Sequence, residues 1–257
     1  MHQQIRISAV SYLNTRPFLY GLRKKPVAGI DLALDMPSEC ARKLLAGEVE
    51  IGLIPAAVLP LLENPVILSD YCIGATGPVL SVKLYSAVPL EKIKRVLLDY
   101  QSRTSVMLVR ILAAESWKIQ PEWLPAAAGF EQDIAGDTAG VVIGDRTFAL
   151  NGKFPYEYDL AESWLQLTGL PFVFAVWAGT GNFSEKFIRD FNASLAFGVS
   201  SIDAILAEES FDLPAGLVAS YLGKNISYSL DEQKKAGLAL FLQKLSRITA
   251  SDEGAKK

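Results

Sequence analysis

The chain has 257 residues and a net charge of −3, from 25 Lys and Arg against 28 Asp and Glu, and half of its residues are hydrophobic. This length is enough for a globular core in one or two domains, and the acidic balance argues against nucleic-acid binding, so we expect a small molecule as the partner. The only histidine is His2, which argues against a Ser-His-Asp triad, a Cys-His dyad and a histidine-rich zinc site.

The sequence shows no targeting or membrane segment. Its first residues, MHQQIRISAVSYLN, lack the basic stretch and apolar core of a signal peptide, and its apolar stretches are shorter than the roughly 18 residues of a membrane span. Cys40 and Cys72 lie far apart and form no C-x-x-C motif, so we expect them to be buried and reduced. These features predict a cytoplasmic protein without membrane insertion.

Short apolar runs alternate with helix-like segments along the first two thirds of the chain. This order is typical of an α/β protein, and we expect a largely parallel sheet. Ser38 is placed to open a helix that Gly47 ends, and Ser102 and the residues after it precede another. The strands are expected at residues 5–10, 31–36, 50–54, 79–85, 95–98, 140–143 and 172–177.

After about residue 182 only helices are expected. Ser184 is placed to cap one of them, and Ser229 and Glu232 have the spacing of a capping box for the last. Because no flexible linker divides the chain, we expect two α/β lobes joined by crossings near residues 86–93 and 171–179. One lobe then comprises residues 1–87 and 178–257, and the other comprises residues 88–177.

Four polar segments are candidates for a ligand site, since ligands of open α/β sheets bind where strands lead into helices. The first is S-Y-L-N-T-R-P, residues 11–17. Its hydroxyl, carboxamide and guanidinium groups suit a carboxylate, which arginine binds through two hydrogen bonds. The alternative is a turn with a helix cap and Pro17 at the helix start, which explains the same residue types.

The other three segments lie later in the chain. Ser81 stands in an apolar run, where a buried hydroxyl needs a partner from a ligand or from the backbone. Residues 99–105, D-Y-Q-S-R-T-S, offer more hydroxyls than one helix cap uses, beside the free N–H groups of a helix start. Asp145, in G-D-R, either accepts a hydrogen bond from a ligand hydroxyl or caps the next helix.

Five motifs are spread over most of the chain: V-S-Y-L-N-T-R-P (10–17), G-P-V-L-S-V (77–82), L-D-Y-Q-S-R-T-S (98–105), I-G-D (143–145), and Y-D-L-A-E-S-W (158–164) with L-T-G-L-P-F-V-F-A-V-W (167–177). Together they resemble the MqnA family, the chorismate dehydratases of the futalosine route to menaquinone. Ala161 and Ser163 depart from the Gly and Glu of the family pattern Y-D-L-G-E-x-W.

This resemblance implies a two-lobed fold like that of type II periplasmic binding proteins, with a ligand cleft between the lobes. It implies a hydro-lyase that converts chorismate to 3-[(1-carboxyvinyl)oxy]benzoate and water without a metal or a cofactor. Asn14 and Ser81 are then the catalytic residues, nearest the reacting centre. The implied substrate-binding residues are Ser11, Arg16, Ser102, Thr104, Ser105 and Asp145.

The general base stays open, because the sequence offers no suitable histidine. The candidates are Asp145, another carboxylate brought in by folding, and a carboxylate of the substrate itself. Two other functions also stay open. One is the sibling 1,4-dihydroxy-6-naphthoate synthase, whose motif S-P-C-P-N-D is absent here, and the other is a non-catalytic protein that binds a small anion.

Overall fold

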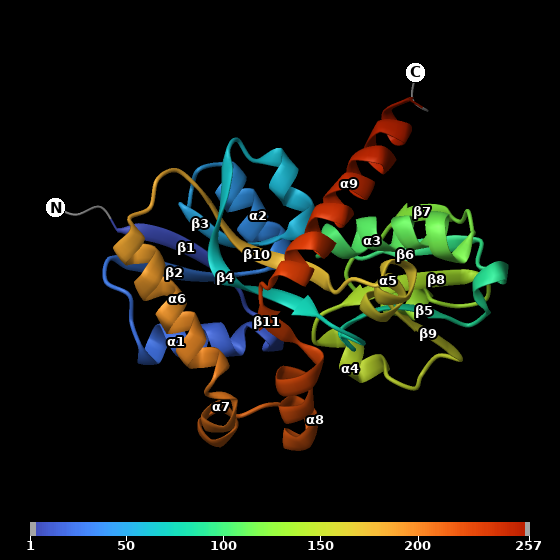
Figure 1. Cartoon of the computed structure of the whole chain (residues 1–257). Helices are drawn as coiled ribbons and strands as arrows, with labels where there is room; N and C mark the ends of the chain where they lie inside the picture. Colours follow the sequence, from blue (N-terminus) through green and yellow to red (C-terminus); the bar gives the residue numbers. More distant parts are fainter. Residues whose placement is uncertain (1–3, 255–257) are drawn as a thin grey trace. The chain divides into compact units, whose positions relative to one another are not determined.

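The computed structural model describes residues 4–254 and divides the chain into two compact units (Figure 1). Unit 1 is Met1–Ala75 with Val173–Asp231, and unit 2 is Thr76–Phe172 with Glu232–Lys257. The chain thus passes between units at 75/76, 172/173 and 231/232, whereas the sequence predicted two passages, at 87/88 and 177/178. The C-terminal helix, predicted with the first lobe, groups with unit 2.

Unit 1 contains a mixed sheet with the strand order β11-β4-β10-β3-β1-β2. Strand β1 lies between β2 and β3 and pairs in parallel with both, whereas β10 runs antiparallel to β3 and β11 antiparallel to β4. The strands are β1 (Ile5–Val10), β2 (Ile30–Asp35), β3 (Ile51–Pro55), β4 (Pro65–Ala75), β10 (Phe172–Thr180) and β11 (Ser227–Ser229).

The helices α1 and α6 of unit 1 pack together at glycines. A methyl group on Gly198 would lie 1.8 Å from the carbonyl oxygen of Pro17, and one on Gly21 would lie 2.1 Å from that of Ser194. The two backbones therefore approach as closely as glycine allows. The helical segments of unit 1 are η1 (Leu13–Thr15), α1 (Arg16–Lys24), α2 (Pro37–Leu45), η2 (Ala56–Leu61), α6 (Glu185–Val199), α7 (Ile202–Glu208), α8 (Ala215–Ser220) and η6 (Tyr221–Asn225).

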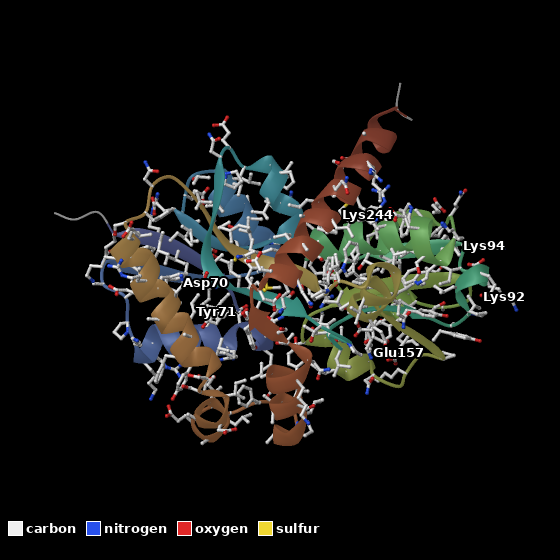
Figure 2. All side chains as sticks on the ribbon, viewed as in Figure 1. Asp70, Tyr71, Lys92, Lys94, Glu157 and Lys244 are labelled. Carbon is white, nitrogen blue, oxygen red and sulfur yellow. The ribbon has the colours of Figure 1, made fainter. Side chains whose placement is uncertain are left out.

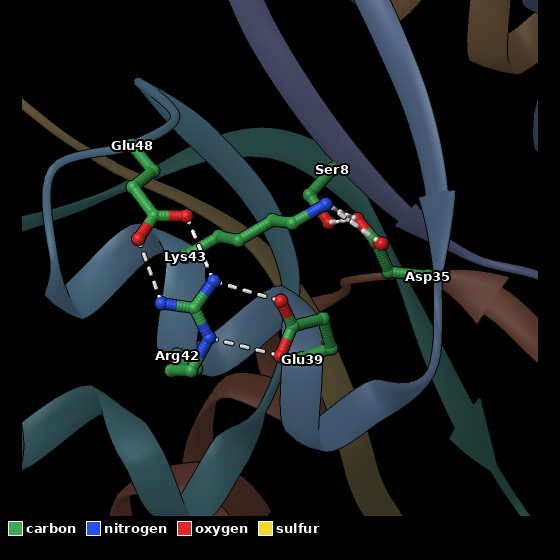
Figure 3. Close-up of polar contacts among 6 residues, drawn as sticks. All are labelled: Ser8, Asp35, Glu39, Arg42, Lys43 and Glu48. Atoms are coloured by element: carbon green, nitrogen blue, oxygen red, sulfur yellow. Dashed lines mark hydrogen bonds and ion pairs between the residues drawn. The ribbon is translucent and has the colours of Figure 1, made fainter.

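Polar contacts of Asp35, the last residue of β2, hold α2 against the sheet of unit 1 (Figure 3). The carboxylate accepts a hydrogen bond from Ser8 Oγ at 2.7 Å and pairs with Lys43 Nζ at 2.7 Å. Burial alone would raise the pKa of Asp35, but the hydrogen bonds from Lys43 and Ser8 outweigh it, and the pKa lies below its ordinary value. Asp35 is thus a paired carboxylate that favours its charged form.

Unit 2 contains a second mixed sheet, with the strand order β7-β6-β8-β5-β9. Here β6 pairs in parallel with β7 and β8, whereas β5 runs antiparallel to β8 and β9. The strands are β5 (Val82–Ser86), β6 (Arg95–Leu98), β7 (Glu122–Pro125), β8 (Thr138–Ile143) and β9 (Tyr156–Asp159). The helical segments are η3 (Leu90–Lys92), α3 (Thr104–Leu112), η4 (Ala113–Trp117), η5 (Phe130–Asp133), α4 (Arg146–Leu150), α5 (Leu160–Thr168) and α9 (Glu232–Gly254).

The expected α/β class is confirmed, but the sheets are mixed rather than largely parallel. The antiparallel strand β5 follows the first passage between units, at 75/76, and β10 begins at the second, at 172/173. No strand–helix–strand crossover within one sheet fixes their direction, so the rule for parallel sheets does not apply to them. Strands β4, β7, β9 and β11 were not predicted.

The apolar stripes of α6 and α9 belong to the cores of the two units. Phe191 of α6 meets Trp177 edge to face, with ring centroids 5.2 Å apart. Phe241 of α9 meets Phe172 and Trp164 in the same way, at 5.1 Å and 6.2 Å, which explains why α9 groups with unit 2. Over residues 4–254, no helix combines the length and the apolar character that a membrane span needs.

Candidate functional site

Three of the four polar segments meet at one edge of the unit 2 sheet. Because β5 is antiparallel to β8 and β6 is parallel to it, the start of β5 lies beside the ends of β6 and β8. The N–H of Gly144 donates to the carbonyl oxygen of Ser81 at 2.9 Å, and the N–H of Ile143 donates to Asp99 Oδ2 at 3.0 Å. We call this region, formed by residues 80–81, 99–105 and 143–146, the unit 2 edge.

Ser81 lies one residue before β5, in a turn, rather than inside a strand as the sequence predicted. Leu80 adopts a left-handed conformation with φ of 64°, which ends the extended backbone there. Its N–H donates to Asp159 Oδ2 at 2.7 Å, while Asp159 Oδ1 accepts the N–H groups of Ala161 and Glu162 at the start of α5. One buried carboxylate therefore shapes the turn of Ser81 and caps α5.

The two departures from the family pattern lie beside this carboxylate. Ala161 donates its N–H to Asp159 Oδ1 at 3.0 Å, and Ser163 Oγ donates to the Asp159 carbonyl oxygen at 2.8 Å. Burial raises the pKa of Asp159, and the N–H donors around it lower the pKa without cancelling that effect. Both departures therefore leave the cap of α5 intact.

Asp99 connects two segments of the unit 2 edge, and its side chain is fully buried. It accepts the N–H groups of Gln101 at 2.9 Å and Ile143 at 3.0 Å. Arg146 donates through Nη2 to Asp99 and through Nη1 to Glu131, both at 2.5 Å. Burial raises the pKa of Asp99, and these donors lower it only in part. Because both of its oxygens accept hydrogen bonds, Asp99 holds the segment after β6 and the segment after β8 in place.

The hydroxyl groups of residues 102–105 lie at the start of α3. Ser102 Oγ accepts the N–H of Ser105 at 3.0 Å, which uses Ser102 as a helix cap. Thr104 and Ser105 are both buried in the first turn of α3. Asp145 is exposed and directly precedes α4, and its side chain makes no capping hydrogen bond there.

The first polar segment lies in unit 1, where it forms η1 and the start of α1. Asn14 is half-buried, its carbonyl oxygen accepts a hydrogen bond from Tyr228 Oη at 3.0 Å, and its Oδ1 accepts one from Thr15 Oγ1 at 3.2 Å. Arg16 is exposed and lies 3.5 Å from a carboxylate oxygen of Glu209. Ser11 is exposed, so this segment offers a mixture of fixed and accessible polar groups.

Nucleophilic and metal chemistry find little support in the part of the chain that the structure describes. Cys40 and Cys72 are buried thiols that form no disulfide within the described residues, and burial raises the pKa of Cys40 to about 12, which keeps it protonated. Across residues 4–254, no three His, Cys, Asp or Glu side chains gather as metal ligands do. His2 lies outside the described residues.

The chemistry of the unit 2 edge suits a carboxylate ligand. A helix start provides N–H groups and a partial positive charge, and the nearby serine and threonine hydroxyls can donate hydrogen bonds. The sequence did not predict the pairing of Asp99 with Arg146 or of Asp159 with Leu80. Each aspartate has one local indication in the sequence. Asp99 directly follows a strand, and Asp159 lies three residues before Glu162, which is the spacing of a helix start.

Comparison with solved structures defines the class of fold. A protein from Archaeoglobus fulgidus matches with a TM-score of 0.76 and 16% identity, covering 97% of this chain and 99% of that one. The periplasmic aliphatic sulphonate binding protein of Escherichia coli matches with a TM-score of 0.63 and 17% identity, covering 100% and 95%. The chain therefore has the periplasmic-binding-protein fold, as the sequence predicted.

The family follows from the sequence comparison. A family model described as menaquinone biosynthesis matches residues 5–247, and the chain belongs to this family. The chorismate dehydratase of Thermus thermophilus is 29% identical over 256 residues, which cover 91% of this chain and 92% of that protein.

Proposed function

We propose that the protein is a chorismate dehydratase, a hydro-lyase of the cytoplasm that acts in menaquinone biosynthesis. The observation that carries this proposal is membership of the menaquinone biosynthesis family over nearly the whole chain, together with a relative of matching extent that bears this name. The substrate of this reaction is a small dicarboxylate. The polar groups of the unit 2 edge suit a carboxylate, which supports the proposal.

The proposed reaction loses the C3 proton and the C4 hydroxyl of chorismate as water and leaves 3-[(1-carboxyvinyl)oxy]benzoate. The ring carboxylate makes the C3 proton acidic through the conjugated double bond, and the ring becomes aromatic when hydroxide leaves. The protein then has to hold the substrate, provide or orient a base, and donate a hydrogen bond to the departing hydroxyl. This chemistry needs neither an imidazole nor a metal.

We assign roles to the polar segments on this basis. Asn14 and Ser81 are each assigned as a hydrogen-bond donor to the C4 hydroxyl or to a carboxylate of the substrate. The N–H groups and hydroxyls at the start of α3 bind a carboxylate, with Ser102, Thr104 and Ser105 as the residues involved. Ser11 and Arg16 provide further polar contacts, and Arg16 shares its charge with Glu209.

The hydrogen bonds of the carboxylates favour some candidate bases over others. Asp99 and Asp159 each accept several N–H hydrogen bonds and position the chain, so we assign neither of them as the base. Asp145 is exposed, and it is the remaining candidate of the unit 2 edge beside a carboxylate of the substrate. Asp145→Asn lowers kcat by about 100-fold or more if Asp145 is the base, and leaves it nearly unchanged if the substrate is.

The test is incubation of the purified protein with chorismate, without added metal or cofactor, followed by chromatography of the products. We expect the aromatic ether to form, and Asn14→Ala and Ser81→Ala to lower kcat by about 10- to 1,000-fold. Ser200→Ala, at an exposed serine, is the control and keeps the wild-type rate. Unchanged chorismate overturns the proposal, and saturable binding without product favours the non-catalytic anion-binding protein.

A further inference from the structure

Unit 2 has a cavity of about 440 Å³ at the C-terminal end of α3. Arg110, in the last turn of α3, lies about 9 Å along the helix axis from Thr104 at its start, so the cavity is separate from the unit 2 edge. The lining residues come from α3, η4, the loop after it, β7 and α9, and they are Arg110, Ala113, Ala114, Lys118, Ile119, Gln120, Pro121, Trp123 and Ile248.

The charge of this lining is one-sided. Arg110 and Lys118 are cationic, and none of the described residues that line the cavity is a carboxylate. The Arg110 guanidinium lies over the Trp123 ring, 5.8 Å from its centroid. Two cationic side chains on one cavity give it a local positive potential, which attracts anions. The lining therefore favours an anionic ligand.

The backbone at Lys118 is a second, independent observation. Lys118 follows η4 in a left-handed conformation, with φ of 57° and ψ of 39°, where glycine is the favoured residue. A side chain in that conformation costs free energy, and such positions cluster at ligand sites. Lys118 Nζ donates to the carbonyl oxygen of Ala114 at 3.3 Å, which keeps the ammonium group at the cavity. Lys118 thus combines a strained backbone with an ammonium group placed to bind an anionic ligand.

Helix α9 forms one wall of the cavity, through Ile248. An ion pair between Lys244 of α9, labelled in Figure 2, and Glu115 of η4 fixes this wall. The carboxylate of Glu115, which lies close to the cavity in sequence, is thus paired with Lys244. Ile119, Pro121 and Ile248 make the remaining walls apolar. The cavity thus combines a cationic region with apolar surfaces and an aromatic ring.

We propose that this cavity, the Arg110 pocket, binds a small organic anion that carries a flat apolar ring, such as an aromatic carboxylate. Arg110 and Lys118 bind the carboxylate, and Trp123, Ile119 and Ile248 contact the ring. The volume lies within the range of about 300–1,000 Å³ that is usual for small-molecule sites. This site is independent of the proposed dehydratase activity, because none of its residues belongs to the unit 2 edge.

The probe is 2-naphthoate, with uncharged 2-naphthylmethanol as its matched control, titrated by calorimetry and by tryptophan fluorescence. We expect saturable binding of the acid that Arg110→Gln and Lys118→Gln each weaken by about tenfold or more, since each removes a charge-assisted hydrogen bond. Trp123→Leu should weaken it as well, and 2-naphthylmethanol should bind at least about tenfold more weakly than the acid. Lys92→Gln, at an exposed lysine far from α9 in Figure 2, should change nothing.

Two further variants separate this site from the others. Binding to the Arg110 pocket should persist in Ser81→Ala, whereas binding at the unit 2 edge should not. Lys118→Gly should raise the melting temperature by relieving the backbone and should weaken 2-naphthoate binding as much as Lys118→Gln does. The proposal is overturned if 2-naphthoate does not bind, if its affinity is the same in Arg110→Gln and Lys118→Gly as in the wild type, or if the alcohol binds equally well.

Discussion

The two units hold their candidate site segments by different physical means. In unit 1, the helix that follows Asn14 is placed by close packing of backbones at Gly21 and Gly198, and the Asn14 carbonyl is held by one hydroxyl. In unit 2, two buried carboxylates, Asp99 and Asp159, accept the N–H groups of the loops that carry the candidate residues. Packing fixes one segment, and buried charge fixes the other.

This difference predicts different sensitivities. Close packing depends on volume, so a single methyl group disturbs it and pH does not. A buried carboxylate depends on its donors and on its protonation state, so loss of charge or a change of pH disturbs it. Substitutions in the two units should therefore separate the two mechanisms.

The largest effect is expected from Asp99→Ala. It leaves Arg146 without one partner and leaves the N–H groups of Gln101 and Ile143 without an acceptor, so the free energy of unfolding should fall by about 3–5 kcal/mol. Urea denaturation measures this. The control is Asp137→Ala, at an exposed pair with Arg95, which should cost little. Equal losses in the two variants contradict the role given to burial.

Gly198→Ala should have the next largest effect. The added methyl group meets the carbonyl oxygen of Pro17 and forces α1 and α6 apart, which should lower the free energy of unfolding by about 1–3 kcal/mol. Since α1 follows η1 directly, turnover of chorismate should fall too. Gly216→Ala is the control, because its methyl group meets nothing within 4 Å, and it should be neutral or stabilise by less than about 1 kcal/mol.

A smaller effect is expected from Tyr228→Phe. The change removes the hydroxyl that donates to the Asn14 carbonyl oxygen and keeps the ring, so the loss of stability should be about 0.5–1.5 kcal/mol. If this bond orients Asn14, kcat for chorismate should fall more in Tyr228→Phe than in Tyr20→Phe, where the lost hydroxyl donates to Glu208. A fall of equal size in both variants argues against an orienting role.

The stability that Asp35 contributes should change with pH in the opposite direction to the stability that Asp99 contributes. Asp35 ends a strand and Asp99 directly follows one, and both have a cationic partner, yet the pKa of Asp35 is lowered and that of Asp99 is raised. Stability from Asp35 is present above its unfolded pKa of about 3.9 and is lost as the pH falls through its folded pKa. Stability from Asp99 is complete below about pH 3.9 and is lost as the pH rises through its folded pKa.

The unfolding free energies of Asp35→Asn and Asp99→Asn across the acid range measure this contrast. The penalty of Asp35→Asn should grow as the pH rises from about 3, and that of Asp99→Asn should shrink. Penalties that change in the same direction would show that pairing, rather than burial, governs both groups.

Local patterns in the sequence were enough for much of the fold. Strands β1 and β6 begin and end at the predicted residues, and Ser184 caps α6 as expected, with its Oγ accepting the N–H of Phe187. Strand β1 alternates apolar with polar residues at its start, and β6 is a short apolar stretch after Arg95. The cap is a contact within one turn, so neighbours in the chain determine all three features.

The features that the sequence did not predict depend on distant partners. The turn of Ser81 is stabilised by the hydrogen bond from the Leu80 N–H to Asp159, 79 residues further along the chain. The position of the Asp99 side chain is stabilised by its ion pair with Arg146, 47 residues further along. Strand β9 is short and polar and exists by pairing with β5, so its own residues do not indicate it. The candidate residues were recognised from the family motifs, and their arrangement came from these long-range contacts.

The double role of Asp159 restricts which sequences the crossover to α5 can tolerate. Ser, Thr and Asn are ordinary substitutes for aspartate at a helix start, and each could still cap Ala161 and Glu162. Serine and threonine have a single side-chain oxygen, and asparagine has an NH2 group, a donor, in place of the second carboxylate oxygen. None of the three therefore offers a second oxygen to accept the Leu80 N–H. Substitutions that are conservative for the helix are therefore disruptive for Ser81, and natural variation at position 159 should be narrower than at other helix caps of the chain.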